Sequence, residues 1–182
     1  MIPDIARVEP LINTDELQSR IAEIGRRISE DYAGSDLTIV GILKGSVPFV
    51  ADLIRAITVP LQIDFLELSS YEGGLQSSGS VRLLKDLSHN IEGKHVLIVE
   101  DIVDTGHTLR YLMETFKTRH PASVRVCTLL DKPEGRVPGE AFSIDYTGFT
   151  IPNHFVVGFG LDLGGYFRNI PYVGVYSPEG DE

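Results

Sequence analysis

The chain has 182 residues, a length that suits one domain with one hydrophobic core, so we expect residues 1–182 to form a single domain. Its hydrophobic fraction of 42% and charged fraction of 23% argue against disorder of the whole chain. The formal net charge of -10 disfavours broad electrostatic binding to nucleic acid.

No targeting or membrane segment is evident in the sequence. No stretch is apolar for the ~18–20 residues that a membrane span needs. The N-terminal MIPDIARVEP lacks the basic start and apolar run of a signal peptide. The single cysteine, Cys127, lies in an apolar run and is expected to be a buried strand residue. These features predict a cytoplasmic protein that binds neither nucleic acid nor membrane.

Hydrophobic spacing predicts alternating helices and strands. A helix capped by Thr14 is expected over residues 14–31. The remaining expected elements are a strand at 37–43, a helix capped by Ser46 and ending near 57, a strand at 61–68, a Gly- and Ser-rich loop at 69–80, strands at 81–84 and 95–100, a helix at about 106–119, a strand at 123–130, and short strands near 143–147, 155–159 and 172–176. This alternation predicts an α/β fold, with a mainly parallel sheet that has helices on both faces and binds ligands beyond the carboxyl ends of its strands.

The strongest chemical signal is VEDIVDTGHT at residues 99–108. A buried strand is expected to end at two adjacent acids, Glu100 and Asp101, and Asp104 follows after two apolar residues. The next residues open a helix, whose first backbone N–H groups can bind a phosphate. Carboxylates beside such a cradle suit ribose hydroxyls and Mg2+. Taken alone, the same acids could equally be turn formers or helix caps.

This segment closely resembles the motif with which type I phosphoribosyltransferases bind phosphoribosyl pyrophosphate (PRPP). Further similarity lies in GILKG at 41–45, SSY at 69–71, LLDKPEGR at 129–136 and the segment 151–175, in the family's order and spacing. The last two segments are typical of the 6-oxopurine branch, the hypoxanthine-guanine phosphoribosyltransferases.

The resemblance implies a type I phosphoribosyltransferase fold. This fold has a mainly parallel twisted sheet flanked by helices, a small hood region and a flexible active-site loop. The implied activity belongs to purine salvage: transfer of the phosphoribosyl group of PRPP to hypoxanthine or guanine, giving IMP or GMP and pyrophosphate, with Mg2+ as cofactor.

The resemblance also implies a role for each matching residue around PRPP. Glu100 and Asp101 would hold the ribose hydroxyls with Mg2+ nearby, and Asp104 would be the general base beside the purine ring nitrogen. The loop that binds the 5′-phosphate would consist of Thr105, Gly106, His107 and Thr108. The family often has Lys or an apolar residue in place of His107. The pyrophosphate would contact Lys44, Gly45, Ser70, Tyr71 and Arg168.

On the purine side, the resemblance implies that Lys132 donates to the 6-oxo group and that Phe155 stacks on the base. The backbone of Val156 would contact the ring edge. Asp162 would lie at this site and support a second Mg2+ through water, although the glycines of DLGGYF suggest local flexibility there. From the residues alone, Lys132 would be a solvated surface lysine, and Phe155 and Val156 would be core residues.

Two other functions stay open at this point. Some proteins of this fold are regulators that bind nucleotides and RNA, although the net charge of -10 and the absence of a basic stripe weigh against that function here. The chain could also be an enzyme for xanthine or adenine. Relatives are dimers or tetramers, so a homodimer or homotetramer is expected.

Overall fold

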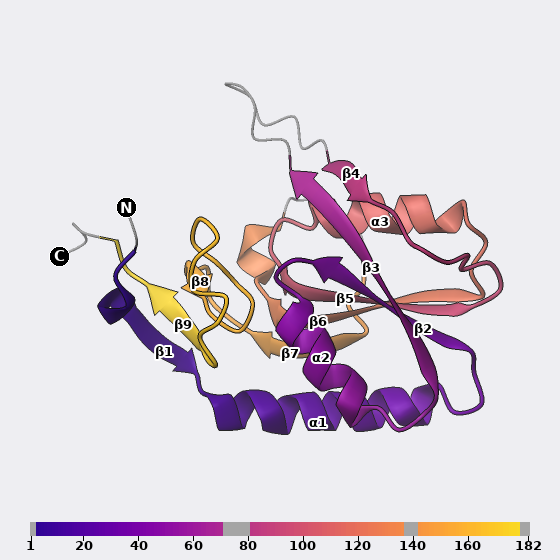
Figure 1. Ribbon diagram of the computed structural model, residues 1–182, viewed down its shortest axis with the longest axis horizontal. Helices are drawn as coiled ribbons and strands as arrows, with labels where there is room; N and C mark the ends of the chain where they lie inside the picture. The colour runs from indigo at the N-terminus through magenta and orange to yellow at the C-terminus, as the bar shows by residue number, and fades with distance from the viewer. Residues whose placement is uncertain (1–2, 71–80, 137–141, 179–182) are drawn as a thin grey trace.

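The computed structural model describes residues 3–70, 81–136 and 142–178, which form a six-stranded sheet, a separate three-stranded sheet and three α-helices (Figure 1). The elements in chain order are the 3-10 helix η1 (Ile5–Arg7), β1 (Val8–Ile12), α1 (Thr14–Asp31), β2 (Leu37–Leu43), α2 (Val47–Ala56), β3 (Leu61–Ser70), β4 (Val81–Lys85), β5 (His95–Val103), α3 (His107–Lys117), β6 (Ser123–Asp131), the 3-10 helix η2 (Pro133–Gly135), β7 (Tyr146–Thr150), β8 (Val156–Val157) and β9 (Val173–Tyr176). No helix in these ranges is long and apolar enough to cross a membrane.

The large sheet is mainly parallel, as predicted. Its strand order is β4-β3-β2-β5-β6-β7, and only β4 runs antiparallel to its neighbour. Helices cover both faces of this sheet. Two adjacent residues of β5 show this, because successive side chains of a strand point to opposite faces. Leu97 packs in one core cluster with Ile24 of α1 and Phe49 of α2. Val96 packs in the other with Phe116 of α3.

Both predicted helix caps differ in detail from the structure. The N-cap of α1 is Asn13 rather than Thr14, and it forms a capping box with Glu16. Ser46 does precede α2, but its hydroxyl donates to the Ile42 carbonyl oxygen at 2.6 Å instead of accepting from the helix. Both alternatives satisfy a polar group locally, and sequence spacing does not distinguish them.

Several predicted strand bounds were wrong. β5 continues to Val103, so Glu100 and Asp101 lie inside the strand rather than at its end. β3 extends to Ser70, so the expected loop 69–80 begins inside a strand, and its remainder lies outside the described residues. β7 occupies Tyr146–Thr150 rather than 143–147. Pairing with neighbouring strands sets these limits, and a single sequence does not show which residues pair.

The three-stranded sheet, which we call the hood sheet, has the order β1-β9-β8 with antiparallel pairing throughout. It stands beside the large sheet, and its strands β1 and β9 are the first and last strands of the chain's described part (Figure 1). β1 was not predicted, because Pro10 interrupts a segment of only five residues that shows no clear strand pattern. Val173 of β9 belongs to the same buried cluster as Leu17 of α1, so the hood sheet packs onto the core of the large sheet.

Cys127 lies in β6 and is fully buried, as expected. Burial raises the pKa of its thiol far above the ordinary value. The thiol is therefore protonated at neutral pH, and its role is to pack in the core.

Candidate active site

The residues singled out in the sequence gather where the parallel strands end. Four segments leave the carboxyl ends of neighbouring strands, and they carry Lys44 after β2, Asp104 after β5, Lys132 after β6 and Phe155 after β7. Backbone bonds hold these segments together: Lys132 N–H donates to the Val103 carbonyl oxygen at 2.9 Å, and Ile151 N–H donates to that of Asp131 at 3.0 Å. The site lies where ligands bind in sheets of this kind.

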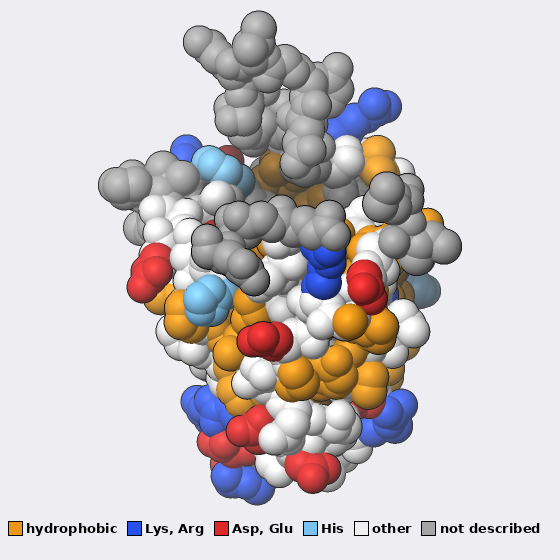
Figure 2. Space-filling view, turned by 90° about the vertical axis from the view of Figure 1, so that its left-hand side faces the viewer, with side chains coloured by type: hydrophobic (Ala, Val, Ile, Leu, Met, Phe, Trp, Pro, Cys, Tyr) orange, Lys and Arg blue, Asp and Glu red, His pale blue; other side chains and the backbone are white. Residues whose placement is uncertain are grey.

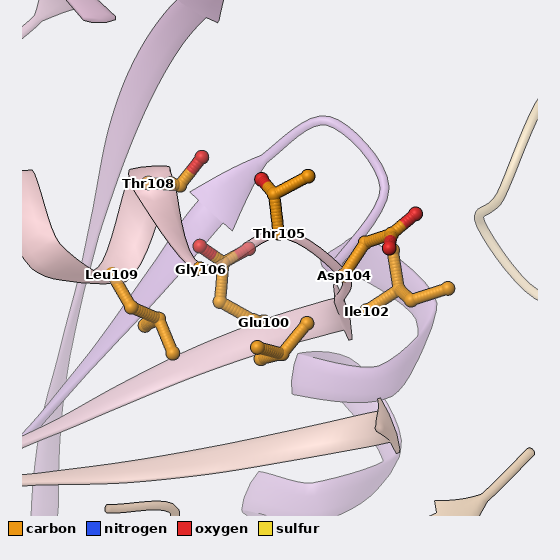
Figure 3. Close-up of a pocket in the computed structure, with 8 residues that line it drawn as sticks. Glu100, Ile102, Asp104, Thr105, Gly106, Thr108 and Leu109 are labelled. Atoms are coloured by element: carbon orange, nitrogen blue, oxygen red, sulfur yellow. The ribbon is translucent and has the colours of Figure 1, made fainter. Parts of the chain in front are cut away.

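A cavity of about 110 Å³ opens at the start of α3 (Figure 3). Its lining consists of Glu100, Ile102, Val103, Asp104, Thr105, Gly106, Thr108 and Leu109. Gly106 is the N-cap of α3, in the left-handed region at φ 88°, and it has no side chain with which to cap the helix. The N-terminus of α3, the positive end of the helix dipole, borders the cavity and suits an anion. His107 begins α3 but does not line the cavity.

The two adjacent acids of β5 face different sides. Glu100 lines the cavity, and its side chain points from the strand toward the turn at Gly106 (Figure 3). The Asp101 carboxylate lies against Gly45 instead, since a Cβ added at Gly45 would fall 1.6 Å from one of its oxygens. Strand alternation explains the separation. The two carboxylates therefore do not converge on one point but lie on two sides of β5.

Both acids are held in a way that opposes their negative charge. Burial, together with the neighbouring charge of Asp101, raises the pKa of Glu100 well above its usual range. Burial also raises the pKa of Asp101 to about 6, although the N–H of Ile102 and the guanidinium of Arg168 partly oppose this rise. Nearby positive charge does not offset the cost of burying these two carboxylates. A bound cation, or hydrogen-bond donors of a ligand, would stabilise their charged forms.

The segment around Gly160 packs tightly against the turn after β2. The Leu43–Lys44 peptide bond is cis. A Cβ added at Gly160 would fall 1.9 Å from the Gly45 carbonyl oxygen, so the two backbones touch. The Lys44 ammonium, by contrast, points outward: its side chain is 70% exposed, and it lies 3.8 Å from Glu67. This turn therefore offers its backbone, rather than its lysine, to the interior of the site.

Arg168 and Asp162 form a small network beside that turn. One terminal nitrogen of Arg168 donates to the Gly160 carbonyl oxygen at 2.6 Å, and the other lies 2.6 Å from the Asp162 carboxylate. The second Asp162 oxygen accepts from the Gly165 N–H at 2.6 Å. The sequence suggested local flexibility at this glycine pair, and the structure instead shows a turn that Asp162 ties together on two sides.

Asp104 and Lys132 form an ion pair at the centre of the site. The Lys132 ammonium lies 3.2 Å from an Asp104 carboxylate oxygen, and the lysine side chain is only 9% exposed. The interpretation of Lys132 as a solvated surface lysine was therefore wrong. A Cβ added at Gly135 would fall 1.8 Å from the other Asp104 oxygen, so this glycine leaves room for the acid. Gly135 carried no recognisable signal in the sequence.

Phe155 and Val156 differ in exposure. The Phe155 ring is 52% exposed, so its assignment to the core from the residues alone was wrong, whereas Val156 is buried as expected. β8 is an edge strand of the hood sheet. The Tyr176 N–H donates to the Phe155 carbonyl oxygen at 3.0 Å, so the backbone groups of Phe155 face β9. In an antiparallel pair the next residue faces the other way, so the N–H and C=O of Val156 point toward the open edge of β8. That edge can bind a planar ligand through backbone groups.

Two further candidates are not placed by the structure. The side chain of Ser70 and the whole of Tyr71 lie outside the described residues. Within the described part of the chain, no group of three or more His, Cys, Asp or Glu residues could hold a metal ion. Glu100, Asp101 and Asp162 therefore do not form a complete ligand set by themselves.

Comparisons with known proteins agree with this arrangement. A family model described as the phosphoribosyl transferase domain matches residues 13–163. The chain is 49% identical over 97% of its length to hypoxanthine-guanine phosphoribosyltransferase of Streptococcus pneumoniae strain R6, and it covers 96% of that protein. It is also 49% identical over 97% of its length to the bifunctional protein TilS/HprT of Listeria innocua, of which it spans only 26%.

A solved structure shares the whole fold. The hypoxanthine phosphoribosyltransferase of Staphylococcus aureus superposes with a TM-score of 0.90 at 44% identity, over 96% of this chain and 94% of that one. Sequence and structure thus agree over nearly the full length, well beyond the segment around α3. The chain belongs to the phosphoribosyltransferase family and, within it, to the hypoxanthine-guanine phosphoribosyltransferases.

Proposed function

We propose that the chain transfers the phosphoribosyl group of PRPP to hypoxanthine or guanine, giving IMP or GMP and pyrophosphate in purine salvage. The observation that carries this proposal is the Asp104–Lys132 pair, 3.2 Å apart. It lies between an anion cavity at the start of α3 and the exposed ring of Phe155. A 5′-phosphate, a reacting centre and a flat base can then occupy one line along the strand ends.

The cavity at α3 suits the ribose 5-phosphate half of PRPP. The backbone N–H groups at the start of α3 and the hydroxyls of Thr105 and Thr108 would donate to the 5′-phosphate. His107 would contribute its backbone N–H. Glu100 would accept from the ribose hydroxyls. Within the described residues no donor reaches its carboxylate, and only burial and Asp101 shift its pKa, so its oxygens can accept bonds from a ligand.

The pyrophosphate half would lie near the turn after β2. The backbone at Lys44 and Gly45 would face it, and the guanidinium of Arg168, whose side chain is 33% exposed, would contact it. Arg168 would have to keep or exchange its bond with Asp162 when the pyrophosphate binds. Ser70 and Tyr71 are proposed to contact the same group, on the resemblance alone.

Mg2+ fits the acids of this site. Carboxylate oxygen is the ligand type that Mg2+ prefers, and Mg2+ is commonly held by one or two carboxylates together with substrate phosphates. Because Glu100 and Asp101 lie on two sides of β5, each would contribute to Mg2+ binding separately, together with oxygens of PRPP, and Asp162 would support a second ion through water. Bound Mg2+ would neutralise charge that develops on the leaving pyrophosphate. The raised pKa values of Glu100 and Asp101 are consistent with a site completed by a cation.

The chain's own groups would then act on the base. Phe155 would stack on the purine, and the open edge of Val156 would bond its ring edge. Lys132 would exchange its bond with Asp104 for one to the 6-oxo group. Asp104 would take the proton from the ring nitrogen as that nitrogen bonds to C1′ and displaces pyrophosphate from it.

One assay tests this function. The purified chain, with PRPP and Mg2+, is given hypoxanthine, guanine, xanthine or adenine separately, and nucleotide and pyrophosphate are measured. We expect hypoxanthine and guanine to react and adenine to be rejected, because Lys132 offers only donors and the 6-amino group of adenine presents hydrogens to it. Turnover of adenine as fast as hypoxanthine would contradict the role of Lys132.

Lys132→Ala sharpens the test. It should lower hypoxanthine use far more than PRPP binding and narrow the gap to adenine without creating a good adenine enzyme. Lys94→Ala is the matched control, because Lys94 pairs with Asp36 at 4.0 Å at the opposite, amino-terminal end of β5. Equal losses in the two variants would point to a general effect on the fold.

We also propose that residues 1–182 form one domain, since the hood sheet and the large sheet share a core cluster. The homodimer or homotetramer expected from the resemblance stays a prediction, which light scattering of the purified chain would test. The cytoplasmic location and the absence of nucleic-acid partners stay predictions as well.

A further inference from the structure

Three aromatic rings form a row that leads away from the proposed base site into the hood sheet. The rings of Phe155 and Tyr176 meet edge to face, with centroids 6.4 Å apart and an angle of 70° between planes. Tyr176 also lies against Phe167, with centroids 6.0 Å apart. Phe155 is 52% exposed whereas Phe167 is 9% exposed, so the row runs from solvent to the hood core.

Tyr176 holds Phe155 in two ways. Its ring meets the Phe155 ring in an edge-to-face arrangement, and its backbone N–H donates to the Phe155 carbonyl oxygen at 3.0 Å. A half-exposed aromatic side chain with no such neighbour would sample several rotamers in water. A ligand that stacks on it would then have to order the ring on binding, which lowers affinity.

Tyr176 itself is fixed from both sides of β9. The strand lies in the middle of the hood sheet, with β1 on one side and β8 on the other, and Tyr176 is paired with Val8 of β1. The Phe167 ring packs against the Tyr176 ring. Phe167 itself has a left-handed backbone conformation, with φ 74°, which an aromatic residue rarely adopts. Tyr176, Phe167 and β1 all lie outside residues 13–163, the part of the chain that matches the family model.

We propose that Tyr176 is a positioning residue for the purine: its ring holds Phe155 in the orientation that stacks on the base. This inference rests on the proposed function, since it assumes that Phe155 meets a purine. It goes beyond that function by assigning base affinity to a side chain on β9 that does not touch the substrate. The phosphate cavity at α3 is formed by β5 and α3, so Tyr176 should leave phosphate binding unchanged.

Calorimetric titration with two ligands separates the base from the phosphate. IMP carries both, and ribose 5-phosphate lacks the base. Tyr176→Ala should bind IMP about 3- to 10-fold more weakly than the wild type, the range expected for loss of one aromatic pair, and should bind ribose 5-phosphate within about two-fold. Tyr176→Phe keeps the ring, and it should bind both ligands like the wild type. In turnover, Tyr176→Ala should raise the KM for hypoxanthine and leave that for PRPP unchanged.

Tyr176→Leu guards against loss of folding, because it keeps an apolar side chain but no ring. Thermal melting identifies any variant that does not fold. If Tyr176→Ala is unfolded, Tyr176→Leu should show the same selective loss of IMP binding.

Two results would overturn the inference: wild-type IMP affinity in the folded variants without a ring, or equal weakening of IMP and ribose 5-phosphate. A wild type that binds IMP no more tightly than ribose 5-phosphate would contradict the proposed function as well. If the wild type binds IMP more tightly than ribose 5-phosphate and the Tyr176 variants bind IMP equally well, only the role of Tyr176 is contradicted.

Discussion

Asp101→Asn should make the ligand-free protein more stable at neutral pH. Burial raises the pKa of Asp101 from 3.8 to about 6, so the folded chain resists the negative charge that an unfolded chain carries freely. That pKa difference corresponds to ~3 kcal/mol at a pH above both values. Asn removes the charge but keeps an oxygen that can accept from the Ile102 N–H. The pKa of about 6 already includes the attraction of Arg168, so ~3 kcal/mol is the largest gain that Asn can give. Because the Asn amide must also find an acceptor in this half-buried place, we expect a gain of ~1–3 kcal/mol, or ~2–12 °C in Tm.

The pH dependence gives this prediction its sign. The ionised Asp101 carboxyl lowers the free energy of unfolding of the wild type. This loss grows as pH rises from 3.8 to about 6, and it reaches its full size above that range. Well below pH 3.8 the acid is protonated in both folded and unfolded chains, and the cost disappears. The advantage of Asp101→Asn should therefore be largest at pH 7.5 and should fall to less than ~1 kcal/mol at pH 4.

Urea unfolding between pH 4 and pH 8 measures this difference. Asp36→Asn is the control, because the Asp36 side chain is 65% exposed and its removal should not produce such a pH-dependent gain. A variant at Asp101 that is no more stable than the wild type at pH 7.5 would refute the reasoning. So would a gain that persists unchanged at pH 4. The same variant should bind PRPP more weakly with Mg2+, which would show that the acid is kept for ligand binding.

Three other predictions follow from the site and the sheet. Asp104→Asn should keep PRPP binding in calorimetry but lose ~10²–10⁴-fold in turnover, as expected for a general base, and wild-type turnover would exclude that role. Activity should disappear in excess EDTA and return with Mg2+, whereas full activity in EDTA would contradict the metal proposal. Asp64→Ala should lower the free energy of unfolding by ~2–4 kcal/mol in urea titration, because the buried Asp64 carboxylate accepts from three backbone N–H groups, of Phe65, Ser88 and His89. A loss below ~1 kcal/mol would show that water replaces these bonds.

The sequence predicted the large sheet well, because its signals are local. The mostly apolar seven-residue run of β2 and the helical spacing of α1 each lie within one segment. The segment around Gly106 also carries its own signal, a strand followed by acids and a helix start. These features need no knowledge of distant residues.

What the sequence did not predict depends on contacts between distant segments. β1 exists because it pairs with β9 near the other end of the chain. The burial of Lys132 depends on the turn that follows β6 and on Asp104 after β5. The exposure of Phe155 depends on where β8 meets the hood sheet. Without the resemblance, nothing in residues 151–176 would have pointed to a base site.

The pairing of β1 with β9 also affects the order in which the site can be assembled during synthesis. The phosphate cavity uses β5 and α3, which are complete before β6 is made. β8 has its only strand partner, within the described residues, in β9, so Phe155 and Val156 gain their support only after Tyr176 has been added. Pairing of segments so far apart in sequence is slow, because a long loop must close first. A nascent or C-terminally shortened chain should therefore acquire affinity for phosphate before it acquires affinity for a base.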